Sequence, residues 1–193
     1  SGVFQFESRL ASEKLRAMSC DRFEDLIAAN GLIRPGPLDS GMTDVYIRRR
    51  TVQEEVRYPH PDLEKTLSAT YGVIVYQEQV MRIANILAGF SLAEADVLRK
   101  AVGKKNAKLI REELRKFVER TVERGVARRV ADQLAKQIET FGRYGFNRSH
   151  SAAYSILSYH TAWLKVHYPA EFMAALLSSV LDKNDDVVKY IEE

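Results

Sequence analysis

Apolar residues recur every three or four positions along most of this 193-residue chain, which is the period of an amphipathic helix. The clearest example is residues 77–88, where four apolar side chains fall on one side. Residues 71–76 (YGVIVY) depart from this pattern, because they are β-branched and aromatic, and they predict a short extended piece. We therefore expect a mostly α-helical protein of roughly nine or ten helices, with little or no β-sheet.

Polar residues at the edges of the helical stretches predict where several helices begin. Ser91 and Glu94 have the spacing of a capping box, in which each side chain bonds the backbone N–H of the other. Asp21 and Ser149 are expected to cap two further helices. The stretch RPGP (34–37) is expected to stop any helix, because its two prolines fix φ and lack an N–H donor.

Positive charge is concentrated in one segment. Residues 97–130 contain 12 Lys/Arg against 4 Asp/Glu, whereas residues 1–96 contain 11 against 14 and residues 131–193 contain 6 against 8. Two long charged helices are predicted on either side of Gly125, and they suggest a possible subdivision of the chain near residues 100–142. Such a field suits a polyanionic partner. A pair of solvated helices with outward-facing cations explains the composition equally well.

The overall composition narrows the class of protein. Apolar residues make up 46% and charged residues 28%, as in soluble globular proteins. The single cysteine, Cys20, excludes an intrachain disulfide framework and a cysteine-based zinc site, and it indicates a reducing, cytoplasmic setting. No apolar run is long enough to cross a bilayer. Because the chain starts with Ser1 and apolar periodicity continues almost to its end, we expect a fragment of a longer polypeptide.

No complete active site is visible in the sequence. Common phosphate-binding glycine motifs and metalloprotease motifs are absent, and no closely spaced pair of aspartates lies on an apolar strand. The spacings of His150, His160 and His167 are too wide for a compact metal site. The last two are instead expected on or beside the packing face of a helix, with apolar neighbours that include Ile156 and Trp163.

A first stretch that points to phosphate binding is RKAVGKK (99–105). Arg99 and Lys100 end one predicted helix, and Gly103 lets the chain turn before Lys104 and Lys105. Four cations within seven residues can converge on a triphosphate or on a nucleic-acid backbone. Alternatively, the first pair is favoured by the negative end of the helix dipole, and the second belongs to a polar linker.

Two further stretches carry similar chemistry. In GRYGFNRSH (142–150) two glycines precede a predicted helix start, where free N–H groups, Arg148 and His150 can receive an anion. The small residues that follow allow close approach of a ligand or, as the alternative, of another helix. The proline-flanked Arg34 and the three arginines 48–50 are weaker candidates, because many such arginines only bond nearby carbonyls.

With these residues assembled, the chain resembles the fingers domain of the bacterial DNA polymerase III alpha subunits, the C-family of replicative polymerases. The resemblance spans essentially all of residues 1–193. It is carried by the following stretches: VFQFES (3–8), NGLIRPGPL (30–38), YGVIVYQEQVM (71–81), ADVLRKAVGKK (95–105), YGFNRSHSAAY (144–154) and TAWLKVHYPAEFMAA (161–175).

The resemblance implies a helical domain that closes over an incoming deoxynucleoside triphosphate. It places Arg99 and Lys100 at the triphosphate, and Tyr144, Asn147 and His150 close to the nucleotide. Weaker candidates for contact with phosphate or the DNA backbone share a positive charge: Lys104, Lys105, Arg148 and Arg34. The family often has two arginines where this chain has Arg99 and Lys100. Lysine lacks the two-pronged geometry of arginine, so its contact with phosphate is expected to differ.

The resemblance also implies what this chain lacks. The catalytic aspartates of the family, and the two Mg²⁺ ions that they bind, belong to a palm outside this chain, so the chain by itself is expected to hold no cofactor and to be inactive. The implied partners are deoxynucleoside triphosphate, primer-template DNA, the remaining polymerase domains, the sliding clamp and other holoenzyme subunits, with no membrane. A second hypothesis is a helical scaffold that binds DNA or a protein without a nucleotide pocket.

Overall fold

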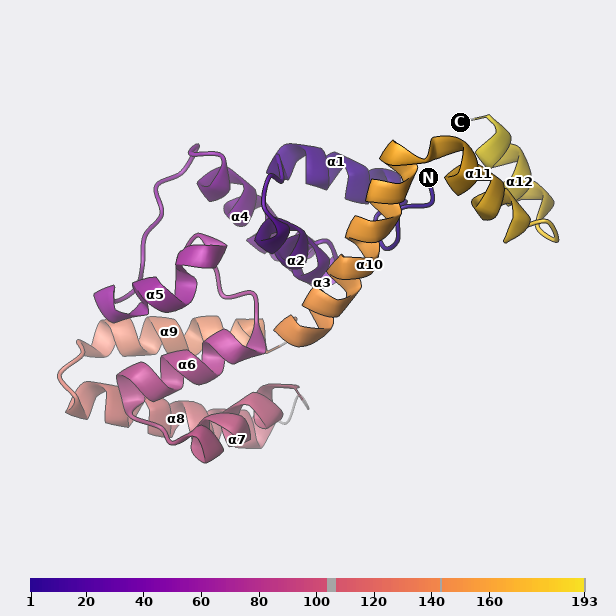
Figure 1. Ribbon diagram of the computed structural model, residues 1–193. Coiled ribbons are helices and arrows are strands. Elements are labelled where there is room, and N and C mark those ends of the chain that lie inside the picture. The colour runs from indigo at the N-terminus through magenta and orange to yellow at the C-terminus, as the bar shows by residue number, and fades with distance from the viewer. Residues whose placement is uncertain (104–106, 143, 193) are drawn as a thin grey trace.

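The computed structural model describes residues 1–103, 107–142 and 144–192. It is built from helices, as the apolar periodicity predicts (Figure 1). The α-helices are α1 (Arg9–Met18), α2 (Phe23–Leu32), α3 (Pro35–Asp39), α4 (Met42–Arg50), α5 (Glu64–Leu67), α6 (Gln77–Ala88), α7 (Leu92–Gly103), α8 (Ala107–Glu123), α9 (Arg128–Phe141), α10 (Arg148–His167), α11 (Pro169–Ser178) and α12 (Asn184–Ile191). The described residues thus form twelve α-helices rather than nine or ten, and they contain no strand.

The helices pack around two separate apolar cores. One core is shared by α6, α7, α8 and α9, which lie side by side in the lower part of Figure 1, and it buries Ile83, Leu98 and Phe117 completely. The other core is formed mainly by α1, α2 and α4 above them, and it buries Met18 and Tyr46 completely. Removing each such side chain from water contributes about 1.5–3 kcal/mol, so both cores stabilise the fold substantially.

The extended segment at residues 73–76 connects the two cores. Successive side chains of an extended chain point to opposite sides. Ile74 accordingly packs into the core of α6–α9, whereas Val73 and Val75 pack into the core of α1, α2 and α4. The predicted extended piece is confirmed for residues 73–76, whereas Tyr71 and Gly72 form a turn with positive φ. Its pairing within the described residues is limited to one isolated parallel bridge between Tyr76 and Phe146, and α6 begins where this segment ends.

The helix α10 packs on α2 through its smallest side chains. Ser151, Ser155 and Ser158 are buried; the Oγ atom of Ser151 donates to the carbonyl of Ile27 at 2.6 Å, and Asn30 donates to Ser155 Oγ at 2.7 Å. The interpretation of the small residues as a helix contact is therefore confirmed. The expected apolar packing face of α10 is wrong, because the apolar side chains are exposed: Ile156, Leu157, Trp163 and Leu164.

The predicted stop at RPGP is confirmed, because α2 ends at Leu32. The same stretch also begins α3 at Pro35, which the sequence did not suggest, because a proline in the first turn needs no N–H donor and already has a helical φ. The predicted cap of α2 is wrong. Asp21 does not cap α2; Arg22 occupies that position, and the Asp21 carboxylate accepts a hydrogen bond from Arg50 at 2.6 Å. The capping box of Ser91 and Glu94 is confirmed, with hydrogen bonds of 3.2 and 2.8 Å.

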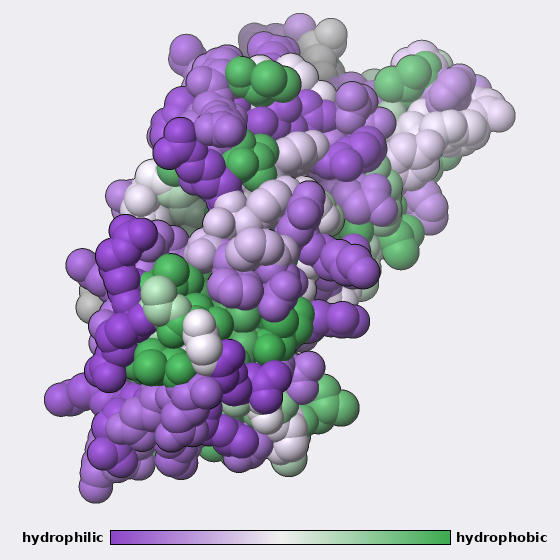
Figure 2. Space-filling model, turned by 90° about the vertical axis from the view of Figure 1, so that its left-hand side faces the viewer, coloured by the Kyte–Doolittle hydropathy of each residue, from purple (hydrophilic) through white to green (hydrophobic). Residues whose placement is uncertain are grey.

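The face of the molecule drawn in Figure 2 is mainly hydrophilic. Figure 2 shows a confined hydrophobic patch on the side that lies to the left in Figure 1, enclosed by hydrophilic surface. None of the helices in the described part of the chain has the length and apolar character needed to cross a bilayer.

Candidate functional site

The first turn of α6 is the point where distant segments of the chain meet. The backbone N–H of Gln77 donates to the carbonyl of Phe146 at 2.9 Å, which joins α6 to the segment before α10. The buried Gln79 accepts hydrogen bonds from the N–H groups of Val75 (2.8 Å) and Tyr76 (2.9 Å) through Oε1. These bonds fix the direction in which α6 begins, because breaking them would leave buried polar groups without partners.

Arg99 reaches this turn from the last part of α7. Its Nε atom donates to Asp96 Oδ1 at 2.8 Å, and its Nη1 atom donates to Gln77 Oε1 at 3.3 Å. Lys100 Nζ lies 2.7 Å from the other oxygen of Asp96. Hydrogen bonds from Lys100 and Arg99 hold the pKa of Asp96 below its usual range. One carboxylate therefore gathers the two cations, and Arg99 also contacts the start of α6.

The amino end of α10 reaches the same turn from the other side. Asn147, and not the predicted Ser149, caps α10: its Oδ1 atom accepts a hydrogen bond from the N–H of His150 at 2.9 Å. The Nδ2 atom of Asn147 donates to Glu78 Oε1 at 2.8 Å, and the N–H of Arg148 donates to Glu78 Oε2 at 3.1 Å. A carboxylate from α6 thus lies at the positive end of the α10 dipole.

The predicted residues from two distant stretches therefore meet at consecutive residues of α6. Arg99 contacts Gln77, and Asn147 contacts Glu78. Glu78 and Arg148 also line a pocket of about 450 Å³ beside this turn, from which Arg99 is absent. The two groups share a point of attachment, and they approach it from different sides.

His150 and Arg34 lie in an aromatic group beside the start of α10. The ring of His150 lies 4.2 Å from that of Tyr154 and 5.3 Å from that of Phe146, between centroids. The Arg34 guanidinium lies 4.2 Å from the Phe146 centroid, and its Nη2 atom donates to the carbonyl of Tyr144 at 2.7 Å. Burial lowers the pKa of Arg34. In this structure Arg34 ties the Tyr144–Phe146 stretch to the end of α2.

The RPGP stretch also shapes the position of Tyr144. The ring of Tyr144 lies directly against Gly36, and a Cβ atom at that position would overlap the ring. The φ of Gly36 is not positive, so backbone conformation does not require a glycine here. The close approach of the Tyr144 ring does. A motif that the sequence suggested as a helix breaker is thus the surface against which Tyr144 rests.

Of the remaining residues predicted to contact DNA, the structure describes Arg148 but not Lys104 or Lys105. Arg148 is exposed, with its guanidinium 5.9 Å from the centroid of the Tyr76 ring. Lys104 and Lys105 lie outside the described residues. For these residues and for Arg34, DNA binding stays a prediction.

Sequence reasoning missed three polar residues that hold this arrangement together: Gln77, Glu78 and Asp96. An acidic residue in the first turn of a helix is usually explained by the dipole of its own helix, so the position of Glu78 did not predict a contact with another helix. Asp96 precedes Arg99 and Lys100 by three and four residues, and this spacing brings side chains together on a helix. That spacing was the one available signal.

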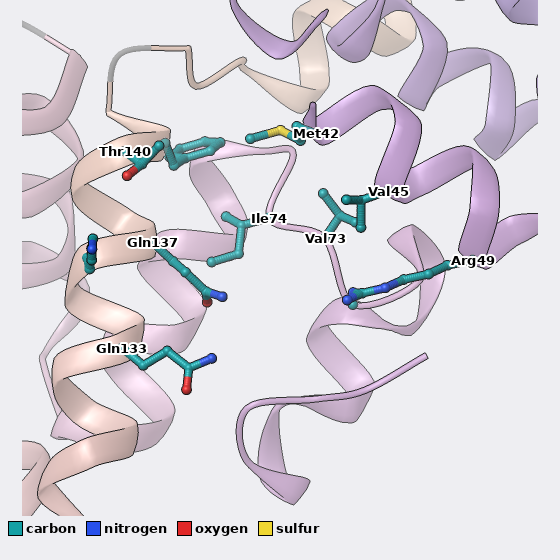
Figure 3. A pocket seen from close by; sticks show the side chains of 11 residues that line it. Met42, Val45, Arg49, Val73, Ile74, Gln133, Gln137 and Thr140 are labelled. Atoms are coloured by element: carbon teal, nitrogen blue, oxygen red, sulfur yellow. The ribbon is translucent and has the colours of Figure 1, made fainter. Parts of the chain in front are cut away.

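A separate groove of about 440 Å³ lies between α4 and α9. Figure 3 shows Met42, Val45 and Arg49 on one side, facing Gln133, Gln137 and Thr140 on the other. Of the residues that the sequence suggested for phosphate contact, the lining contains Arg49, whose Nε atom donates to Glu54 Oε1 at 2.9 Å.

Comparison with known proteins places the chain in a family. The model of the bacterial DNA polymerase III alpha subunit finger domain matches residues 1–125. The chain belongs to this finger-domain family. The match includes α6 and α7, which supply Gln77, Glu78, Asp96 and Arg99 to the site described above.

Curated relatives of this finger domain are named DNA polymerase III subunit alpha. The protein of Pseudomonas fluorescens is 48% identical over 198 residues, an alignment that covers 100% of this chain and 17% of the relative. That of Aquifex aeolicus is 51% identical over 186 residues, covering 96% of this chain and 16% of the relative. The Escherichia coli K12 protein is 45% identical, again with 100% and 17% covered. The chain therefore spans about a sixth of the length of these relatives.

The described residues of the finger domain offer no metal centre. No group of three or more His, Cys, Asp or Glu side chains among them is arranged to hold a metal ion. The one carboxylate close to the candidate nucleotide-binding cations, Asp96, is already paired with Arg99 and Lys100. These side chains do not fit a magnesium site.

Proposed function

We propose that this chain binds the incoming deoxynucleoside triphosphate and primer-template DNA within a bacterial replicative DNA polymerase. The observation that carries the proposal is the meeting of Arg99 and the amino end of α10 at consecutive residues of α6. Membership of the finger-domain family supports the same reading. In this proposal Arg99 and Lys100 contact the triphosphate, and Tyr144, Asn147 and His150 lie close to the nucleotide.

The proposed role is positioning and charge neutralisation. Phosphoryl transfer asks the protein chiefly to align the reacting groups and to stabilise the charge on the phosphate oxygens. Arg99 has five N–H donors, of which one is used toward Gln77 and two lie against Asp96, so donors remain for a phosphate. The catalytic carboxylates and their Mg²⁺ are assigned to a part of the polymerase outside this chain, in a cytoplasmic enzyme.

A helical scaffold without a nucleotide pocket is the second candidate. It is favoured by the exposed apolar side chains of α10, of which Trp163 is 42% exposed, because such a surface suits a protein partner. This reading assigns DNA or protein binding to the chain and leaves nucleotide binding to other domains.

Photo-crosslinking separates the two candidates. A full-length alpha subunit that contains this segment is irradiated with a photoreactive deoxynucleoside triphosphate and primed DNA, and the labelled peptides are mapped. We expect label in peptides from the end of α7 or the start of α10, and an excess of unlabelled nucleotide should abolish it. Specific label found entirely outside this chain would favour the scaffold.

Substitution of His150 tests its proposed place near the nucleotide. His150→Ala in the full-length subunit is expected to slow single-turnover incorporation about two- to tenfold, because one neutral hydrogen bond contributes about 0.5–1.5 kcal/mol. His160→Ala, which removes an exposed histidine from the same helix, serves as the control. Equal rates for the two variants would contradict the placement of His150.

A further inference from the structure

Glu78 connects two helices that carry residues of the proposed nucleotide site. It lies in the first turn of α6 and is half-buried. Its carboxylate points to the amino end of α10, where Oε1 accepts from Asn147 Nδ2 at 2.8 Å and Oε2 accepts from the N–H of Arg148 at 3.1 Å. Both of its oxygens are therefore used to hold another helix.

Asn147 is hydrogen-bonded to both Glu78 and His150. The Oδ1 atom of Asn147 accepts from the N–H of His150 at 2.9 Å, while its Nδ2 atom donates to Glu78. An amide has one accepting and one donating end, so these two bonds together fix the direction in which Asn147 faces. If Glu78 lost its carboxylate, only the bond to His150 would remain to orient this side chain.

Gln77, the residue before Glu78, contacts Arg99. Gln77 Oε1 accepts from Arg99 Nη1 at 3.3 Å, and the N–H of Gln77 is bonded to Phe146 at 2.9 Å. The position of Arg99 relative to Asn147 is therefore set through two consecutive residues of α6. A change of about 1 Å in such a relation is enough to slow a reaction about a hundredfold.

We propose that Glu78 is a positioning residue for nucleotide binding: it holds Asn147, and through it the start of α10, at a fixed place relative to Arg99. This inference rests on the proposed function, because it assumes that Asn147, His150 and Arg99 contact the nucleotide. Both oxygens of Glu78 are bonded to groups at the start of α10, so in this proposal it acts through them.

A double-mutant cycle tests this role in a full-length alpha subunit that contains the segment. Glu78→Ala is expected to raise the KM for nucleotide about tenfold, because the charge-assisted bond that orients Asn147 is lost. Glu78→Gln keeps one accepting oxygen for Asn147 but turns an NH2 donor toward the N–H of Arg148, so its KM should lie between those of wild type and Glu78→Ala. Because Glu78 acts through Asn147, Glu78→Ala should add little to the effect of Asn147→Ala.

The matched control is Glu171→Ala, which removes an exposed glutamate from the first turn of α11. Melting curves are measured on every variant. If Glu78→Ala does not fold, Glu78→Asp replaces it, because its carboxylate is one methylene farther from Asn147. Fully additive effects of the Glu78 and Asn147 substitutions, or a Glu78 variant with the kinetics of the control, would overturn the inference.

The same assay includes an Arg99→Gln, Lys100→Gln variant, which distinguishes failure of the proposed function from failure of the positioning role of Glu78. If that variant has the kinetic constants of wild type, the proposed function itself fails. If it loses activity while Glu78→Ala matches the control, the proposed function stands and only the positioning role of Glu78 is wrong.

Discussion

Reversing the charges of Arg99 and Lys100 in a full-length alpha subunit is expected to lower kcat/KM for nucleotide about 10²- to 10⁴-fold. Each charge-assisted hydrogen bond to phosphate contributes about 1.5–3 kcal/mol, and about 1.36 kcal/mol corresponds to a factor of ten. The KM should rise and kcat should fall together, because the triphosphate charge is stabilised both before and during transfer. Steady-state kinetics on primed DNA, with nucleotide varied, measure both constants.

The control for this experiment reverses Lys108 and Arg129, two exposed cations of the same basic segment, and so changes the net charge equally. A milder pair, Arg99→Gln and Lys100→Gln, avoids placing new carboxylates beside Asp96. If both sets of variants had the same kinetics as the control, the basic segment would act as a diffuse field and not through these two side chains. The phosphate role of Arg99 and Lys100 would then be wrong.

Asp25→Asn is expected to lower the free energy of unfolding by about 3–5 kcal/mol, as breaking a buried ion pair usually does. Asp25 is fully buried, and its carboxylate accepts hydrogen bonds from Arg22 (2.8 Å), Arg50 (2.8 Å) and Tyr46 (3.2 Å). Arg50 is itself nearly buried, and its Nε atom has no hydrogen-bond partner among the described residues. Neutralising Asp25 therefore leaves the nearly buried Arg50 paired with the exposed carboxylate of Asp21, and removes the buried half of its ion pairs. Urea denaturation measures the loss.

The pH dependence of stability provides a second measurement on the same variant. Burial alone would raise the pKa of Asp25, but hydrogen bonds from Arg50 and Arg22 outweigh it and hold the pKa well below its usual range. A carboxyl with a lowered folded-state pKa stabilises the fold above its unfolded pKa of about 3.9, and this contribution is lost as the pH falls below that value. Wild type should lose stability more steeply than Asp25→Asn below about pH 4.

Asp39→Asn is the matched control for Asp25, because Asp39 is exposed at the end of α3. Its effect on the free energy of unfolding should stay within about 0.5 kcal/mol, as for most surface substitutions. An Asp25 variant as stable as this control would show that the ion cluster does not stabilise the fold.

Local sequence patterns predicted the helices that depend on local chemistry. The bounds predicted for α6 agree with the structure, and the capping box of Ser91 and Glu94 forms as expected. Predictions failed where two local explanations competed. Asn147 and Ser149 can both cap a helix, and the choice of Asn147 goes with its second bond to Glu78, a residue far away in the sequence.

The packing face of α10 was predicted wrongly for a similar reason. Periodicity identifies an apolar face but does not say which neighbour is available to cover it. In the structure the serine side of α10 packs on α2, because small side chains let the two backbones approach closely, and the apolar side remains exposed.

The sequence by itself determined the helical class, most helix positions, the basic middle segment and the family resemblance, because each depends on residues close together in the chain. The tertiary structure alone decided that Arg99 and the start of α10 contact two consecutive residues of α6, Gln77 and Glu78. It also decided that Arg34 bonds the carbonyl of Tyr144. These contacts link residues far apart in sequence, and their formation depends on how the two cores orient the helices that carry them.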